Sequence, residues 1–124
     1  MRLTIHRLSQ IPTRHQPQVA LIVEGASLPE QAEFYLATFN DRAVALAWRD
    51  NTTLTFIAVR DITRRRGIGQ ELLAQIKLDA KAAGLSQLNC DPRQAQPTAQ
   101  AGLSAFLQAQ GFNASGAMLS CNLD

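Results

Sequence analysis

Residues 59–70 read Val-Arg-Asp-Ile-Thr-Arg-Arg-Arg-Gly-Ile-Gly-Gln, which places a basic turn with two glycines between an apolar run and an amphipathic stretch. This order predicts a strand that leads through a tight turn into a helix. The spacing Gly67-x-Gly69 removes side chains where backbone N–H groups approach an anion, and the first turn of a helix points its unsatisfied amides the same way. We therefore expect this segment to bind a polyphosphate, with the arginines before Gly67 adding positive charge.

Length and composition limit the possible architectures. A chain of 124 residues can bury one core but not two, so we expect a single domain over residues 1–124. No apolar run approaches the roughly 20 residues that a membrane helix needs, and the start lacks the apolar stretch of a secretion signal. Cys90 and Cys121 show no metal-type spacing. These features predict a cytoplasmic protein with reduced core thiols, no metal site and no membrane partner.

Hydrophobic periodicity predicts most of the regular elements. The expected strands are residues 2–8, 34–39, 43–48, 53–59 and 85–90, with one or two more at 112–123. The expected helices are a short piece at 19–23, a long helix from 68 to 84 and a second helix at 99–110. The nearly continuous apolar run at 53–59 indicates a central strand buried on both faces.

This order of elements predicts an α/β (α+β) fold with a mixed sheet, antiparallel at first and with a parallel crossover around the long helix. The glycine turn then lies at the carboxyl end of the central strand. Ligands bind at that position in open α/β sheets.

Two familiar nucleotide motifs do not fit the turn. It lacks the Gly-x-x-x-x-Gly-Lys-Ser/Thr pattern of a P-loop, and no third glycine with a downstream ribose-binding acid supports a Rossmann site. What remains is Arg64-x-x-Gly67-x-Gly69, which resembles the Gln/Arg-x-x-Gly-x-Gly/Ala signature of the GNAT superfamily of N-acetyltransferases. The resemblance implies a mixed central sheet of about six strands with helices on both faces, splayed between the central strand and its parallel neighbour.

The same resemblance implies a binding site for acetyl-CoA (coenzyme A). In that superfamily the amides of the turn bind the pyrophosphate, and the backbone of the central strand pairs with the pantetheine arm. Carried over to this chain, Ile57 and Val59 provide the backbone groups of the strand, and Arg64 braces the turn. The residues expected around the phosphates are Arg65, Arg66, Gly67, Ile68, Gly69 and Gln70.

The flanks of the motif resemble one family within the superfamily, the PanZ (PanM) family. The similar segments are residues 1–8, 37–42, 59–70 and 105–112, whereas residues 9–33 depart from the family. Its members are small acetyl-CoA-binding proteins that associate with the zymogen of aspartate α-decarboxylase, promote its self-cleavage to the pyruvoyl form and restrain pantothenate synthesis. The resemblance therefore implies an acetyl-CoA sensor with this zymogen as its partner.

Catalysis is less well supported by the sequence. Acetyl transfer to an amine uses a base for the amine proton and an acid for the departing thiolate. The superfamily's usual acid is a tyrosine four residues before the Gly-Phe that ends the second helix, and here that position is Leu107. Tyr35, the only tyrosine, falls on an early strand, where we expect a structural role. We predict no catalytic residues, but transfer can proceed through water and positioning, so a working N-acetyltransferase is the open alternative.

Other candidate groups carry weaker signals. We expect Asp61 to pair with neighbouring arginines, and His6 and His15 to be surface or structural residues. Nothing beside Ser104 or Cys90 in sequence suggests an activated hydroxyl or thiol.

Arginine-rich turns also bind the phosphates of nucleic acids. The formal net charge here is only +2, aromatic residues are few, and no basic helix extends the cluster, so we expect no nucleic-acid partner. A phosphate-binding interaction domain unrelated to CoA is a third, minor alternative.

Overall fold

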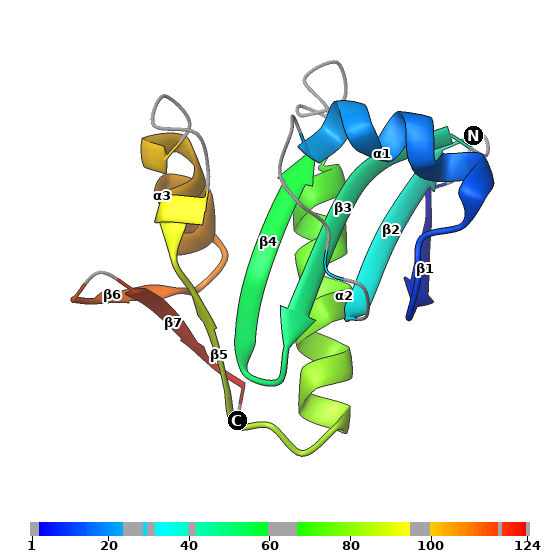
Figure 1. Ribbon diagram of the computed structural model, residues 1–124. Helices are drawn as coiled ribbons and strands as arrows, with labels where there is room; N and C mark the ends of the chain where they lie inside the picture. Colours follow the sequence, from blue (N-terminus) through cyan, green and yellow to red (C-terminus); the bar gives the residue numbers. More distant parts are fainter. Residues whose placement is uncertain are drawn as a thin grey trace.

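The computed structural model describes residues 3–23, 29, 32–39, 42–59, 67–94, 100–116 and 118–123. In these residues seven strands form one mixed sheet in the order β1-β2-β3-β4-β5-β7-β6 (Figure 1). The strands are β1 (Leu3–Leu8), β2 (Glu33–Phe39), β3 (Arg42–Asp50), β4 (Thr53–Val59), β5 (Gln87–Cys90), β6 (Asn113–Ser115) and β7 (Met118–Asn122). The helices are α1 (Gln16–Val23), α2 (Ile68–Ala82) and α3 (Gln100–Ala109), with short 3-10 turns η1 (Thr13–His15) and η3 (Pro92–Gln94). The predicted α/β class is confirmed, and the tail adds two strands to the sheet.

Every pair of neighbouring strands is antiparallel except β4 and β5, which are parallel. Helix α2 makes the crossover between these two strands, as predicted. The helix ends at Ala82, after which Gly84 adopts a φ of 88° and the amide of Leu85 donates to the carbonyl oxygen of Ala80. This left-handed glycine ending is the one that the sequence predicted.

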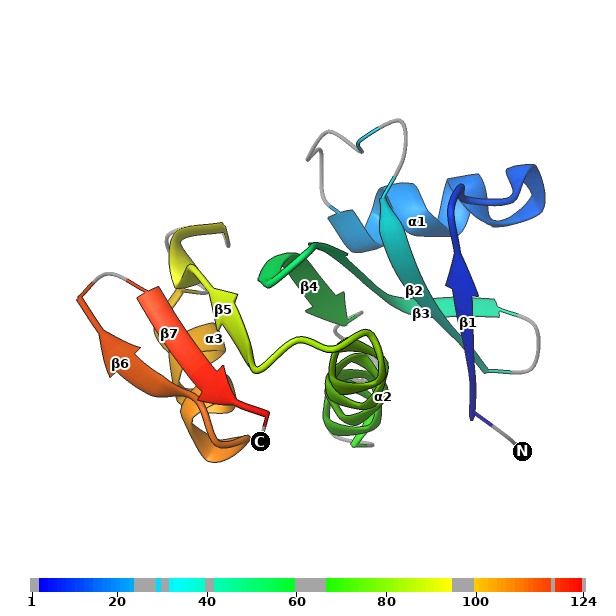
Figure 2. The same ribbon diagram turned by 90° about the horizontal axis from the view of Figure 1, so that it is seen from below.

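The helices cover both faces of the sheet (Figure 2). Helix α1 packs on one face, where its apolar side chains join a cluster with Phe34, Leu36, Leu46 and Trp48. Helices α2 and α3 pack on the other face, where the cluster includes Leu72, Leu73, Ile76, Leu107 and Leu119. No helix in the described part of the chain is both long enough and apolar enough to cross a membrane.

The prediction that residues 53–59 are buried on both faces was wrong. In β4 only Leu54 and Ile57 are buried, and Thr55 is exposed. The fully buried strand is β3, in which every residue between Arg42 and Asp50 is buried. The difference arises because β3 has a full-length partner on each side, whereas β5 pairs with β4 over one end only.

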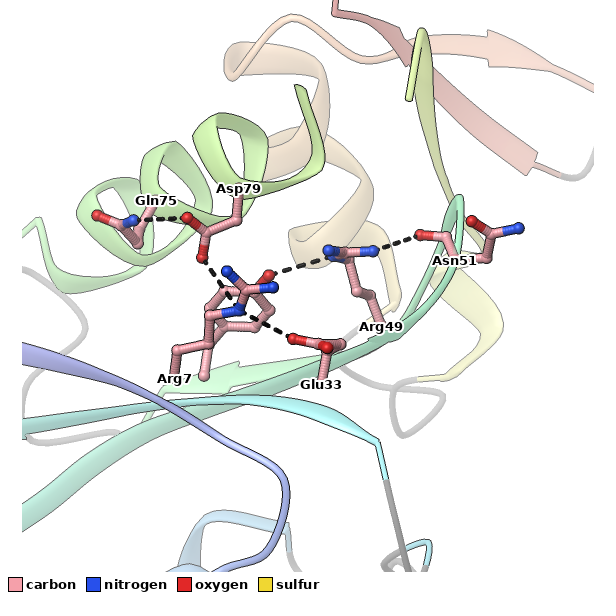
Figure 3. Close-up of polar contacts among 7 residues, drawn as sticks. Arg7, Glu33, Arg49, Asn51, Gln75 and Asp79 are labelled. Atoms are coloured by element: carbon pink, nitrogen blue, oxygen red, sulfur yellow. Dashed lines mark hydrogen bonds and ion pairs between the residues drawn. The ribbon is translucent and has the colours of Figure 1, made fainter. Parts of the chain in front are cut away.

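Polar side chains tie the C-terminal half of α2 to the sheet (Figure 3). Arg7 Nε donates to Glu33 Oε2 at 2.9 Å and lies 3.8 Å from Asp79 Oδ2. Gln75 Nε2 donates to the other carboxylate oxygen of Asp79 at 3.0 Å. These contacts connect β1, β2 and α2, so they restrain the helix that carries the glycine turn at its opposite end.

Candidate functional site

A bulge in β4 lies where the strand leaves its parallel neighbour. Trp48 of β3 is opposite Phe56, but the next residue, Arg49, is opposite Leu54. Thr55 is therefore an extra residue in β4, and it shifts the alternation of side chains so that Leu54 and Ile57 both face the core under α2. Bulges of this kind bend a strand and increase its twist.

Strands β4 and β5 pair only at the beginning of β4. The paired positions are Thr53 with Asn89 and Leu54 with Cys90, next to a 2.7 Å hydrogen bond from the amide of Asn89 to the carbonyl oxygen of Thr52. Strand β5 ends at Cys90, opposite Leu54, so beyond the bulge no described residue of β5 pairs with β4 (Figure 1). The predicted splay between the central strand and its parallel neighbour is confirmed.

Gly67 precedes α2 as its N-cap residue. Its φ of 71° and ψ of 13° are left-handed, a conformation that glycine adopts without a steric penalty. A Cβ built on Gly67 would meet no heavy atom of the described structure within 4 Å. Within the described structure, Gly67 is therefore favoured by its backbone conformation and not by crowding.

The first turn of α2 presents backbone amides that have no acceptor inside the helix. Among the described residues, the first hydrogen bond of the helix joins the amide of Glu71 to the carbonyl oxygen of Gly67 at 3.1 Å, and the N-cap residue Gly67 has no side chain that could cap this end. The amides of Ile68, Gly69 and Gln70 consequently have no acceptor within the helix. Together with the positive end of the helix dipole, they fit an anionic group such as a pyrophosphate. The exposed carboxylate of Glu71 is the one acidic group in this first helical turn, and its negative charge would repel a bound anion.

The end of β4 and the start of α2 lie against each other. Val59 Cγ2 is 3.4 Å from the position that a Cβ on Gly69 would occupy. The strand residues and helix residues predicted for the site are therefore brought together, with Ile57 buried and Val59 half-buried. The predicted residues Arg64, Arg65 and Arg66, and also Asp61, lie outside the described residues.

Leu107, at the position where the sequence resemblance implied a catalytic tyrosine in related proteins, is completely buried in the core beside α2. Its carbonyl oxygen accepts the amide of Phe112 in the turn that ends α3. The side chain holds no proton donor, and its surroundings are apolar. Ser104, one turn earlier, accepts a 3.3 Å hydrogen bond from Gln108 Nε2, and Cys90 is buried.

Tyr35 lies in the core, two strands away from β4. Its hydroxyl oxygen accepts a 3.1 Å hydrogen bond from Nε of Arg49, whose Nη1 donates to the carbonyl oxygen of Asn51 at 3.0 Å (Figure 3). Arg49 is only 5% exposed, and sequence reasoning missed it. Burial raises the pKa of Tyr35, and the hydrogen bond from Arg49 opposes that rise. This phenol binds a buried guanidinium and is placed to stabilise the fold.

The two histidines lie on the α1 side of the molecule in contacts with neighbouring side chains. His6 Nε2 is 3.0 Å from Thr38 Oγ1, and His15 is buried with Nδ1 3.3 Å from Gln18 Oε1. Within the described residues no group of three or more His, Cys, Asp or Glu side chains is placed to hold a metal ion.

Known proteins share both the fold and the sequence pattern. The solution structure of YhhK from E. coli, which was solved with coenzyme A bound, superimposes with a TM-score of 0.82 at 26% identity over 98% of this chain and 99% of that one. The ribosomal-protein-S18-alanine N-acetyltransferase from Escherichia coli gives a TM-score of 0.74 at 18% identity, over 99% and 95% of the two chains, and so shares the fold. A mixed sheet with a splayed parallel pair and an open glycine turn at the start of α2 defines an acetyltransferase (GNAT) domain.

The sequence matches place the chain within that class. The profile of the acetyltransferase (GNAT) domain of PanZ matches residues 4–119. The PanD regulatory factor of Salmonella typhimurium is 30% identical over 127 aligned positions, which cover 92% of this chain and 94% of that protein. The chain belongs to the PanZ family.

Proposed function

We propose that this chain is an acetyl-CoA-binding regulator that acts on the maturation of aspartate decarboxylase, as a single domain over residues 1–124. The observation that carries the proposal is the row of amides at the start of α2 that have no acceptor inside the helix, placed beside the end of β4 that lies beyond its pairing with β5. A polyphosphate and an extended arm can be held by these two neighbouring features, and acetyl-CoA contains both groups.

The residues proposed to hold acetyl-CoA fall into two sets. Ile57 and Val59 bind the pantetheine arm through the backbone of β4. The phosphates are bound by the turn and the first turn of α2, through Arg64, Arg65, Arg66, Gly67, Ile68, Gly69 and Gln70. Bound acetyl-CoA supplies a thioester that is activated for acetyl transfer. This chain binds and orients the cofactor, and its buried Leu107 brings no proton to the departing thiolate.

The lack of an acid at Leu107 favours a regulator over an N-acetyltransferase. The hydroxyl oxygen of Tyr35 accepts a hydrogen bond from Arg49 on another part of the sheet, and Ser104 accepts one from Gln108 within α3. A domain that keeps the cofactor site without the groups for proton transfer is suited to reporting whether acetyl-CoA is present. The relative named PanD regulatory factor supports the same conclusion.

The proposed partner is the zymogen of aspartate decarboxylase, and the proposed outcome is control of pantothenate synthesis. We also propose a cytoplasmic location, supported by the burial of Cys90 and Cys121 as thiols in the core.

Two measurements on the purified protein test this function. Calorimetry should detect acetyl-CoA binding, and immobilised protein should retain the decarboxylase zymogen more strongly when acetyl-CoA is present. Absence of acetyl-CoA binding would contradict the cofactor site. Tight acetyl-CoA binding with no retention of the zymogen would contradict the proposed partner alone.

A further inference from the structure

The two glycines of the turn meet different surroundings. A Cβ on Gly67 would meet nothing within 4 Å, whereas a Cβ on Gly69 would lie 3.2 Å from Cζ of Phe106 and 3.4 Å from Cγ2 of Val59. The first of these distances is shorter than ordinary van der Waals contact between carbon atoms. Gly69 therefore makes room for the tip of an aromatic ring that reaches it from α3.

A second contact joins the same two helices further along. Lys77 of α2 donates from Nζ to the carbonyl oxygen of Gln110, just after α3, and its ammonium group lies 5.5 Å from the centroid of the Phe112 ring. Lys77 is eight residues after Gly69, which corresponds to about 12 Å along the helix axis. Helix α3 is therefore held against α2 at two separate points, and the Phe106 contact is the one at the N-terminal end of α2.

These contacts matter because the sheet itself joins its two parts weakly. Strands β4 and β5 share only two paired positions, and α3 packs with the β5-β7-β6 part of the sheet (Figure 2). C-terminal to the bulge in β4, strand pairing no longer sets the distance between β4 and the β5-β7-β6 part of the sheet. The contact of Phe106 with Gly69 and Val59 lies beyond the last paired position of β4 and β5.

We propose that Phe106 is a positioning residue for the cofactor, which sets the separation between α3 and the facing ends of β4 and α2 at Val59 and Gly69. The inference rests on the proposed function, because it concerns the same site. The separation is then set by the ring of Phe106 and by the absence of a side chain at Gly69. A larger residue at position 69 pushes the ring away, and a shorter residue at position 106 lets α3 settle closer to the end of β4.

A double-mutant cycle tests this relationship. The variants are Gly69→Ala, Phe106→Leu and the double variant, and the measurement is the dissociation constant of acetyl-CoA by calorimetry. We expect Gly69→Ala to weaken binding about tenfold, because its methyl group pushes the Phe106 ring away. Phe106→Leu should weaken binding about threefold, because the shorter side chain lets α3 settle closer to β4. Residues in contact couple, so the two losses should not simply multiply. The double variant should bind nearly as well as Phe106→Leu alone, since leucine lacks the ring tip that the new methyl group meets. A loss in the double variant equal to the product of the single losses would overturn the proposal.

Lys77→Met provides the matched control at the other contact. It should lower the thermal midpoint of the free protein while leaving acetyl-CoA affinity unchanged, because its contact lies away from the α2 N-terminus. If it weakened binding as much as Phe106→Leu does, the effect would be a general loosening of α3, and the positioning role would be wrong. If Gly69→Ala does not fold, Phe106→Ala decides the matter: binding must fall at least about fivefold at a temperature where the variant is folded.

Failure of this inference and failure of the proposed function are distinguishable. Wild-type protein that does not bind acetyl-CoA would overturn both. Wild-type protein that binds acetyl-CoA, with variants whose effects multiply independently, would leave the cofactor site intact and overturn only the role of Phe106.

Discussion

The amide of Glu71 donates a 3.1 Å hydrogen bond to the carbonyl oxygen of Gly67, and in the described part of the chain this bond is the first of α2. Three amides before it, those of residues 68–70, have no acceptor in the helix. Gly67 beside them is left-handed, and a Cβ built on it would meet no described atom within 4 Å. The account of the cofactor site depends on this arrangement, and the first prediction tests it.

Gly67→Val should weaken acetyl-CoA binding by at least about tenfold in calorimetry. The branched side chain would extend into the space where the pyrophosphate is expected. It would also be strained by about 1–2 kcal/mol in the left-handed conformation, so the loss of stability must be measured separately.

Gly84→Val is the control for that strain. Gly84 is also left-handed, with a φ of 88° and nothing within 4 Å of a Cβ, but it follows the opposite end of α2. We expect a similar loss of thermal stability and unchanged acetyl-CoA affinity. Equal affinities in Gly67→Val and the wild type would show that the site lies elsewhere.

Tyr35 should lose its proton above the ordinary tyrosine pKa of about 10, because burial favours the neutral phenol. It is the only tyrosine in the chain, so the ultraviolet absorbance of tyrosinate reports on it alone. A titration of the folded protein should give a higher midpoint than a titration in concentrated urea. Coinciding midpoints would contradict the buried position of Tyr35.

The raised pKa of Tyr35 also predicts how stability changes with pH. The unfolded chain releases the phenol proton near pH 10, before the folded chain does, so above that pH the unfolded state binds fewer protons. The contribution of Tyr35 is therefore complete below about pH 10 and is lost as the pH rises through the folded-state pKa. Urea denaturation across this range should show a steeper loss of stability in the wild type than in Tyr35→Phe.

Tyr35→Phe should also reduce the free energy of unfolding by about 1–3 kcal/mol at neutral pH, because buried Arg49 Nε loses its acceptor. Arg93→Gln, which removes an exposed ion pair with Asp91, is the control and should leave the denaturation midpoint unchanged. A neutral effect of Tyr35→Phe would mean that Arg49 finds another partner.

Local patterns were sufficient to predict most elements and the strand-to-helix turn. The apolar run at 53–59 gave the bounds of β4, and Gly84 correctly marked the end of α2. The burial of β4 could not be read from its composition, because a bulge at Thr55 and a short partner strand leave it partly uncovered. An apolar strand looks the same in sequence whether its neighbour continues beside it or diverges.

The sequence also could not predict contacts between residues that are far apart in the chain. The sequence predicted the helix that carries Phe106, but not that its ring lies over Gly69, because nothing local connects α3 to the start of α2. Arg49 was missed for the same reason: a single arginine at the end of an apolar strand gives no sign of the Tyr35 hydroxyl that binds it.

Incubation with acetyl-CoA and a panel of amines, polyamines and peptides should release no free CoA above background. The physical reason is that Leu107, fully buried in an apolar environment, offers no proton to the leaving thiolate. Release of CoA can be followed with a thiol reagent, with a bona fide N-acetyltransferase as the positive control. Sustained turnover of any acceptor would favour the N-acetyltransferase alternative over the regulator.

The most direct test of the central claim is the rate of self-cleavage of purified aspartate decarboxylase zymogen, measured by gel electrophoresis with and without this protein and acetyl-CoA. We predict faster cleavage when both are present, little acceleration by either alone, and loss of the acceleration with Gly67→Val but not with Gly84→Val. Cleavage at the unassisted rate in the presence of the protein and saturating acetyl-CoA would contradict the account.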